Sequence, residues 1–475
     1  MVSINVQRAK YVFSDWLTTS IAFLVFNVYR FFHFSVGNYE AHTYTLWMYL
    51  IDSKMLVEEI LFPLVMLFVY WLSGYYNNPF QRSRLQELYT TVYTAIINSL
   101  LIYLVLLTND QIAVSTSNYA VLATIFGLLF GMTYLGRAIL TGARFRKIRQ
   151  NRWAFRTIII GTRDKAREET QRLESSLANL GYVAEGYVLT DGDAGEQEFL
   201  GKPVYSLDDL KSVCQKDKVS QILITLPSTS DSRLLKLLGR LFDLDIPVKI
   251  APDLRSYLTS GIRLQDIYGE PFVDLTTPHL RESSQNIKRT LDVAISAIAL
   301  ILLAVPFLIL AALIKSDSKG PVFYKQQRVG RHRCPFYIYK FRTMRVDAEA
   351  AGPQLSSDND PRVTRIGRFM RKYRIDELPQ FWNVLTGDMS LVGPRPEREF
   401  YIRQILEKAP YYTLLHQVRP GITSWGMVKY GYASDVDQMI ERVQYDLLYL
   451  SNMSISVDFK ILIYTVRTVL LGKGK

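Results

Sequence analysis

Five long apolar stretches limit what this chain can fold into. They lie approximately at residues 12–32, 55–70, 92–107, 119–140 and 291–314. A helix that crosses the hydrocarbon core of a bilayer needs roughly 20 predominantly apolar residues. Because the first four stretches fall within the first third of the chain, we predict an N-terminal bundle of four transmembrane helices. The fifth stretch stands apart from them.

Basic residues predict how this bundle is oriented. Arg8 and Lys10 precede the first stretch, and Arg82 and Arg84 lie between the second and the third. The end of the fourth stretch is surrounded by six more cations: Arg137, Arg144, Arg146, Lys147, Arg149 and Arg152. Since cytoplasmic loops carry the excess of Lys and Arg, we expect both ends of the bundle to face the cytoplasm.

The fifth stretch differs from the others because it has basic flanks on both sides and Pro306 in its middle. Matching flanks indicate that both ends face the same side of the membrane. A proline can break a helix because it lacks an N–H donor. We therefore predict a re-entrant helix-break-helix that enters one leaflet and returns. The alternative is a fifth span with a proline kink, which would put the two soluble parts on opposite sides.

The middle of the chain alternates strands and helices. We predict strands at 157–160, 186–189, 221–226 and 247–250, and helices at 164–180 and 233–242. This order is typical of a Rossmann-like parallel sheet. The turn Gly161-Thr-Arg-Asp164 lacks the three glycines that let a backbone approach a pyrophosphate. We therefore favour a structural or regulatory domain, with a nucleotide site as the alternative.

Two adjacent carboxylates, Asp376 and Glu377, mark the last third of the chain. We predict that Asp376 caps the start of a helix with Pro379 in its first turn and Gly387 at its end. A carboxylate at a helix N-terminus stays ionised, which suits a nucleophile. The alternative is that Asp376 is only a cap. The pair stands next to a cluster of cations: Arg365, Arg368, Arg371, Lys372 and Arg374.

Charge and cysteine content narrow the class of partner. The net charge of +12 favours an anionic partner, either nucleic acid, lipid headgroups or a phosphorylated substrate.

Lys340 alternates with apolar neighbours as strand residues do, and two prolines fix the backbone around Arg395. Cys214 and Cys334 lie far apart and have no metal-ligand spacing, so they indicate neither a disulfide framework nor a metal centre.

Three short segments carry a resemblance to a known family. Residues 340–344, 371–380 and 393–397 resemble the signature of the monotopic phosphoglycosyl transferases, bacterial enzymes that start capsule, exopolysaccharide and O-antigen synthesis. Arg374 departs from the Ser or Thr found in many members. The resemblance implies a transmembrane helical bundle at 1–150, a Rossmann-like α/β domain at 151–280, and an α/β monotopic catalytic domain with a re-entrant membrane helix at 281–475.

The resemblance also implies an activity. Asp376 would attack the β-phosphate of a UDP-sugar, and undecaprenyl phosphate would then take the sugar phosphate from a phosphosugar–aspartyl intermediate, after UMP has left. Glu377 matches a position associated with Mg²⁺, and Lys340, Arg371 and Arg395 match phosphate-contacting positions. The implied sugar is a hexose, glucose or galactose. The implied partners include membrane lipid but no nucleic acid, and large members suggest a homodimer. The implied location is the bacterial inner membrane, with several spans and cytoplasmic soluble domains.

Two other classes of function stay open. One is a non-catalytic membrane scaffold whose Rossmann-like domain senses a nucleotide, in which the carboxylate pair would be dispensable. The other is a membrane-bound nucleotide-sugar dehydratase or epimerase. Such an enzyme needs a glycine-rich fingerprint and a Tyr-x-x-x-Lys pair, and the sequence of the middle domain contains neither.

Overall fold

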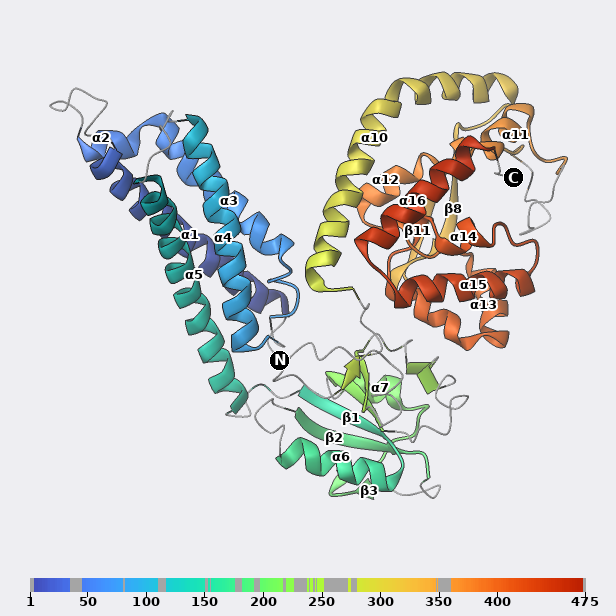
Figure 1. Ribbon diagram of the computed structural model, residues 1–475. Helices are drawn as coiled ribbons and strands as arrows, with labels where there is room; N and C mark the ends of the chain where they lie inside the picture. Colours follow the sequence, from blue (N-terminus) through green and yellow to red (C-terminus); the bar gives the residue numbers. More distant parts are fainter. Residues whose placement is uncertain are drawn as a thin grey trace.

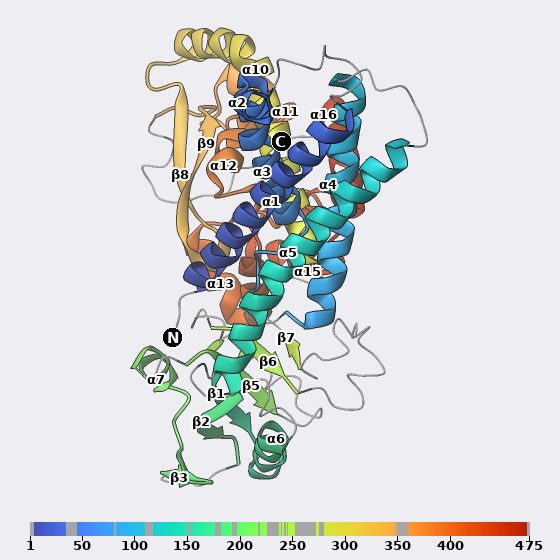
Figure 2. The ribbon, with the colours of Figure 1, turned by 90° about the vertical axis from the view of Figure 1, so that its left-hand side faces the viewer.

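The computed structural model has three parts, which are a helical bundle, an α/β sheet domain and a C-terminal domain that begins with a long helix (Figure 1). In two perpendicular views helix α5 of the bundle runs down to the sheet domain (Figure 2). The structure describes residues 4–34, 45–79, 82–109, 117–149, 153, 155–175, 182–191, 197–216, 219–225, 237–238, 240–241, 244, 246–251, 272–274, 280–346, 348 and 360–472.

The four predicted N-terminal spans are confirmed as helices. They are α1 (Ile4–Phe34), α3 (Ser53–Leu72), α4 (Arg84–Asn109) and α5 (Ser117–Arg149), and a short helix α2 (Leu46–Ile51) precedes α3. Each long helix contains a segment long and apolar enough to cross a membrane. Large apolar residues such as Phe23, Phe26 and Leu129 fill the centre of the bundle. Their outward neighbours are apolar as well, as expected for helices surrounded by lipid.

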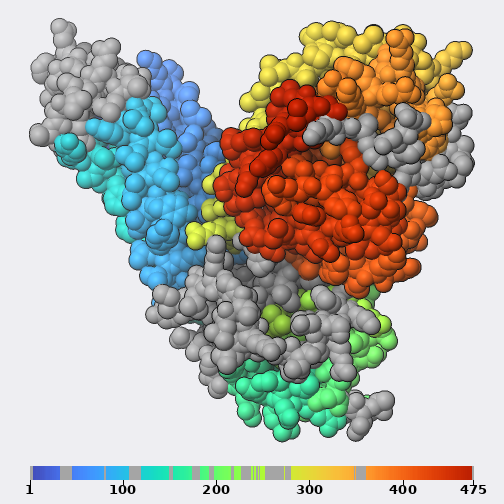
Figure 3. All heavy atoms as spheres, turned by 45° about the vertical axis from the view of Figure 1, so that its right-hand side comes forward, coloured from blue at the N-terminus to red at the C-terminus, as the bar shows by residue number. Residues whose placement is uncertain are grey.

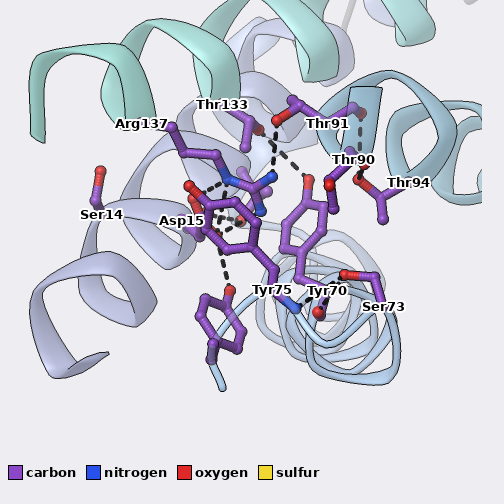
Figure 4. Close-up of polar contacts among 12 residues, drawn as sticks. Ser14, Asp15, Tyr70, Ser73, Tyr75, Thr90, Thr91, Thr94, Thr133 and Arg137 are labelled. Carbon is purple, nitrogen blue, oxygen red and sulfur yellow. Dashed lines mark hydrogen bonds and ion pairs between the residues drawn. The ribbon is translucent and has the colours of Figure 1, made fainter. Parts of the chain in front are cut away.

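A buried ion pair joins the first and last helices of the bundle. The Asp15 carboxylate accepts hydrogen bonds from Arg137 Nε at 2.9 Å and Nη2 at 2.7 Å, and both side chains are fully buried. Arg137 Nη1 also donates to Thr91 on α4 at 2.8 Å, and its guanidinium lies 3.6 Å from the ring centre of Tyr75 (Figure 4). Sequence analysis counted Arg137 as a flanking charge, whereas the structure makes it the polar centre of the bundle.

The middle domain contains the predicted parallel sheet. Its strand order is β2–β1–β5–β6–β7, in which the first three pairings are parallel and the last is antiparallel. The order reverses between β1 and β5, as in a Rossmann-like fold. The strands are β1 (Phe155–Gly161), β2 (Tyr182–Leu189), β5 (Gln221–Thr225), β6 (Val248–Ile250) and β7 (Val273–Asp274).

Other elements of this domain were predicted only in part. Helix α6 (Arg163–Ser175) corresponds to the start of the helix predicted at 164–180. The helix predicted at 233–242 lies largely outside the described residues. A two-stranded hairpin, β3 (Glu198–Phe199) with β4 (Lys202–Pro203), and helix α7 (Leu210–Lys216) were not predicted.

Helix α10 (Glu282–Asp317) contains the fifth apolar stretch and corrects one prediction. It is a continuous helix of 36 residues with Pro306 inside it, so the expected break is absent. A proline removes one backbone hydrogen bond and bends a helix, but the bonds on either side can survive. In Figure 1 the helix rises along the C-terminal domain and then turns across its top. Re-entry into a single leaflet stays a prediction.

Polar side chains fasten the first half of α10 to the C-terminal domain. The Asp292 carboxylate accepts hydrogen bonds from Ser390 Oγ at 2.6 Å and from the Leu391 N–H at 3.2 Å. Arg289 donates to the Val384 and Leu385 carbonyls at 2.7 and 3.1 Å. Further along the helix large apolar side chains are exposed, among them Ile301, Leu302 and Leu308. These exposed residues form the part of α10 suited to contact lipid.

The start of α10 also packs against the bundle. Arg82 Nη2 lies 3.1 Å from a Glu282 carboxylate oxygen, and Asn286 Nδ2 donates to the Trp71 carbonyl at 2.5 Å. Gly74 allows this approach, since a Cβ there would lie 2.6 Å from Glu282 Cβ and its φ is +80°. The bundle and the C-terminal domain diverge above this junction and leave an open gap between them (Figure 3).

The C-terminal domain is built on a hairpin and a short parallel strand pair. The hairpin is β8 (Phe323–Val329) with β9 (Pro335–Phe341), joined by the 3₁₀ turn η3 (Arg331–Arg333). The parallel pair is β10 (Ser390–Val392) with β11 (Gly421–Thr423). The remaining elements are α11 (Arg365–Lys372), the 3₁₀ turn η4 (Ile375–Glu377), α12 (Gln380–Thr386), α13 (Glu399–Lys408), the 3₁₀ segment η5 (Pro410–Gln417), α14 (Trp425–Lys429), α15 (Val436–Ser451) and α16 (Ile455–Leu470).

The buried ion pair of the bundle gives a stability prediction. Arg137→Met leaves the Asp15 carboxylate buried without its partner, and removing one member of a buried pair costs about 3–5 kcal/mol. We expect a clearly lower melting temperature of the purified protein in detergent micelles. The double variant Asp15→Leu with Arg137→Met should recover much of the loss, because no charge is then stranded. Arg84→Met, at an exposed position on α4, is the control. A single variant as stable as this control would contradict a role of the pair in holding the bundle.

Candidate active site

Asp376 and Glu377 lie in the tight turn η4 between α11 and α12. Helix α12 begins at Gln380 with Pro379 as its N-cap, so the prediction that Asp376 caps this helix is wrong. The Glu377 N–H donates to the Arg374 carbonyl at 3.2 Å, which closes a 3₁₀ turn around Asp376. Asp376 is the middle residue of this turn, so it is not the residue that directly precedes α12. The predicted end of the helix at Gly387 is confirmed, with φ +99°.

Glu377 is surrounded by cations that come from separate segments. Its Oε1 lies 2.7 Å from Lys340 Nζ on β9 and 3.5 Å from Arg395 Nη2 in the loop after β10. Its Oε2 lies 3.7 Å from Arg374 Nη1, just before the turn. Only 5% of Glu377 and 9% of Asp376 is exposed, so these charges interact with little water between them. Two of the predicted phosphate-contacting residues, Lys340 and Arg395, therefore meet at the carboxylate pair.

Arg371, the third predicted phosphate-contacting residue, is held differently. Its Nε donates to Thr343 Oγ1 at 2.9 Å. Its charge nevertheless acts on the pair, because it is among the groups that lower the pKa of Asp376. Thr343 belongs to the segment 340–344, which carries part of the family resemblance. Its hydroxyl orients Arg371 by accepting this hydrogen bond.

The two carboxyl groups differ strongly in pKa. Burial, and then the neighbouring charge of Glu377, raise the pKa of Asp376 to about 6, against the opposing charges of Lys340 and Arg371. Burial alone would also raise the pKa of Glu377, but Lys340, Arg395 and Arg374 outweigh it and lower that pKa. Asp376 does not lie at the start of α12, so the expected contribution of that helix dipole to its ionisation does not apply. The pKa of Asp376 therefore lies closer to neutral pH than that of an ordinary aspartate.

A further buried carboxylate, that of Glu397, forms an ion pair with Arg395. Glu397 Oε1 accepts a hydrogen bond from Arg442 Nη2 at 2.6 Å, and Glu397 Oε2 accepts one from Arg328 Nη1 at 3.2 Å. Glu397 Oε1 also lies 4.0 Å from Arg395 Nε. Sequence analysis included Glu397 in a motif but gave it no role, and it missed Arg442, which is 45 residues further along the chain. No spacing in the sequence indicates a contact over that separation.

Arg342 does not contact the carboxylate pair but binds the backbone at the end of α10. Its guanidinium donates to the Ser318 carbonyl at 2.7 Å and to the Lys319 carbonyl at 2.9 Å, directly after α10 ends. Behind it, Ile314 of α10 packs in one cluster with Phe341 and Ile375. The end of the apolar helix is thereby fixed against the residue that precedes Asp376.

The carboxylate pair fits only one kind of metal site. Across the part of the chain that the structure describes, no group of three or more His, Cys, Asp or Glu side chains could hold an ion. Mg²⁺ in proteins is often bound by one or two carboxylates together with substrate phosphates and water. Asp376 and Glu377 fit a Mg²⁺ ion shared with a phosphorylated substrate, and they do not fit a metal held by the protein alone.

Comparisons with known proteins agree with this arrangement. A family model described as bacterial sugar transferase matches residues 283–472. A UDP-N-acetylgalactosamine-undecaprenyl-phosphate N-acetylgalactosaminephosphotransferase of Aeromonas hydrophila is 41% identical over 229 residues, 48% of this chain and 53% of that protein. A UDP-glucose:undecaprenyl-phosphate glucose-1-phosphate transferase of Escherichia coli K12 is 34% identical over 263 residues, 55% of this chain and 57% of that protein.

A third relative extends the match along the chain. A UDP-galactose-lipid carrier transferase of Erwinia amylovora is 32% identical over 368 residues, 73% of this chain and 74% of that protein. The alignments to the Aeromonas and Escherichia proteins span just over half of their lengths. The fold and the site define a protein with helices long and apolar enough to cross a membrane and with a cation-rich carboxylate centre. The chain belongs to the bacterial sugar transferase family, as the resemblance in the sequence indicated.

A second family model, described as a CoA-binding domain, matches residues 72–252. In a Rossmann-like fold a ligand phosphate would bind the backbone at the start of α6. Here the Arg163 N–H donates to both carboxylate oxygens of Asp191, at 2.9 and 3.1 Å. A Cβ at Gly161 would lie 2.0 Å from Thr225 Oγ1, so this glycine serves the close approach of β1 and β5. The residues at this turn therefore do not fit a CoA phosphate.

Proposed function

We propose that this protein transfers a hexose-1-phosphate from a UDP-sugar to undecaprenyl phosphate and releases UMP. The observation that carries the proposal is the buried Asp376–Glu377 pair, which cations from separate segments surround beside the end of a long apolar helix. Phosphoryl transfer depends mostly on positioning and on neutralising charge. An excess of fixed cations around two carboxylates meets both needs.

In this proposal Asp376 is the nucleophile. A carboxylate oxygen of Asp376 bonds to the β-phosphorus of the UDP-sugar, and the bond from that phosphorus to the bridging oxygen breaks, so that UMP leaves with the bonding electrons. A phosphate oxygen of undecaprenyl phosphate then bonds to the same phosphorus and releases Asp376. Within the described chain no Lys or Arg forms an ion pair with Asp376, whereas three pair with Glu377. This difference supports Asp376 as the group that attacks.

The neighbouring residues have supporting roles in the same proposal. Lys340, Arg371 and Arg395 bind the substrate phosphates and keep the diphosphate oriented toward Asp376. Glu377 holds these cations in place and takes part in binding Mg²⁺, which neutralises charge on the diphosphate and on the leaving UMP when it is bound. Ionised Glu377 also raises the pKa of Asp376 and so strengthens its basicity.

The membrane location supports the choice of acceptor. Exposed apolar residues of α10 can contact lipid, and the C-terminal end of that helix packs beside Ile375. A substrate anchored in the bilayer could thus present its phosphate at the carboxylate pair. We place the protein in the bacterial inner membrane with several spans, with its soluble domains in the cytoplasm. The resemblance to large family members supports a homodimer.

The direct test is UMP release from a panel of UDP-sugars with undecaprenyl phosphate in lipid nanodiscs. We expect release with UDP-glucose or UDP-galactose, and the panel includes UDP-N-acetylgalactosamine because the Aeromonas relative is named for that sugar. Asp376→Asn keeps the size of the side chain but removes the anion, and loss of a covalent nucleophile should lower the rate by several orders of magnitude. Asp388→Asn is the control at an exposed position. Wild-type enzyme inactive on every UDP-sugar, or an active Asp376→Asn variant, would count against the proposal.

The raised pKa of Asp376 predicts a pH dependence. Only the ionised carboxylate attacks, so the rate of UMP release should fall about tenfold per pH unit below the pKa of about 6. The measurement is a single UMP burst without undecaprenyl phosphate, because a phosphate monoester itself titrates near pH 6. Lys340→Met removes a charge that lowers the pKa of Asp376 and should move the profile to higher pH, whereas Lys325→Met, at an exposed position on β8, should not. A profile flat to pH 4.5 would refute this account of Asp376.

A further inference from the structure

Arg374 is the residue at this site whose geometry the proposed roles leave unexplained. Its φ is +54° and its ψ is +24°, which places a non-glycine residue in the left-handed region of backbone conformation. Steric contact of the Cβ makes this conformation unfavourable for a residue such as arginine, and glycine would adopt it without that contact. A strained residue beside reactive groups points to a function that the side chain performs.

The side chain of Arg374 is buried and only partly satisfied. About nine-tenths of it is buried, since its side-chain exposure is 10%. Nη1 is 3.7 Å from Glu377 Oε2, which is an ion pair but too long for a good hydrogen bond. Within the described structure Nε is buried and has no hydrogen-bond partner. A buried donor without an acceptor is costly, so the site is arranged for an acceptor that the protein itself does not supply.

The aromatic ring of Tyr432 holds this guanidinium in place. The centre of the ring lies 5.0 Å from Arg374 Cζ and 5.7 Å from Arg395 Cζ, both within cation–π range. One tyrosine therefore faces two arginines whose ion pairs converge on Glu377. The ring limits the rotation of both guanidinium groups. The Nε–H of Arg374 has no acceptor within the described structure, so it can still donate to one.

We propose that Arg374 is a further substrate ligand, which binds a phosphate oxygen through Nε–H and a terminal N–H, with Tyr432 as a positioning residue behind it. This inference rests on the proposed function. A planar pair of parallel donors suits phosphate oxygens, and a lysine could not reproduce it. The phosphate belongs either to the diphosphate of the UDP-sugar or to undecaprenyl phosphate, and the two half-reactions separate these sources.

The test compares Arg374→Lys, Arg374→Gln and Arg374→Gly with wild type. The first half-reaction is UMP release without acceptor, and the second is discharge of the loaded enzyme by undecaprenyl phosphate. We expect all three variants to raise the KM for one phosphate substrate by about ten- to hundredfold, the effect of losing a hydrogen bond to a charged group. A higher KM for the UDP-sugar would show that Arg374 binds the diphosphate. A higher KM for undecaprenyl phosphate would show that Arg374 binds the acceptor phosphate.

Stability separates a binding role from a structural one. Glycine tolerates positive φ, so Arg374→Gly should keep or raise the melting temperature while it weakens binding. Arg333→Gly is a matched control, because Arg333 also has a positive φ, +57°, but lies in the turn at the other end of β9 from Lys340. The control should change neither KM.

A direct measurement of ligand affinity tests the same proposal without relying on catalytic turnover. Calorimetric titration with UDP, and with undecaprenyl phosphate in vesicles, should show the same loss of affinity for one of the two ligands. Arg374→Lys with wild-type KM values would show that charge alone suffices and would overturn the proposal, as would wild-type affinities in all three variants. If wild type transfers sugar phosphate and these variants match it, only this inference fails. If wild type releases no UMP, the proposed function fails instead.

Discussion

The candidate site depends on the burial of two neighbouring carboxylates among a larger number of fixed cations. Removing Asp376 and Glu377 from water would favour their neutral forms, and each would also disfavour the charge on the other. Lys340, Arg395 and Arg374 all converge on Glu377 and keep it ionised. Asp376 has no such partner in the described structure, and burial raises its pKa to about 6. One environment thus gives two adjacent acids different properties, one as a fixed anion and one as a more basic carboxylate.

The position of that site relative to the exposed apolar side chains of α10 depends on polar contacts along this helix. A helix with so many exposed apolar residues could turn freely about its axis, but Asp292 and Arg289 fix its first half to β10 and to the end of α12. Arg342 donates to the two carbonyls that directly follow the helix, those of Ser318 and Lys319. The same helix touches the bundle through Glu282, where Gly74 provides the room. The exposed apolar side chains of α10, the bundle and the carboxylate pair are therefore joined by one continuous helix.

The sequence predicted much of this arrangement where the signal was local. The four long N-terminal helices, the parallel strands of the middle domain and the helix end at Gly387 follow from apolar length, periodicity and glycine conformation. Contacts between distant segments, such as Asp15 with Arg137 or Glu397 with Arg442, could not be predicted, because no regular sequence spacing links the partners. The cap at Asp376 was predicted wrongly, since nothing in the sequence shows that Arg374 adopts a left-handed backbone and closes a 3₁₀ turn there.

The central claim is that Asp376 forms a covalent bond to the sugar phosphate, and mass spectrometry of the enzyme tests it most directly. The protein is incubated with a UDP-sugar but no undecaprenyl phosphate, and intact mass and peptide mapping locate any adduct. The account predicts a mass gain of one sugar phosphate on the peptide with Asp376, together with one UMP released per active enzyme. An adduct that maps to Glu377 or persists in Asp376→Asn would contradict it. Active wild-type enzyme that never carries an adduct would contradict the covalent mechanism itself.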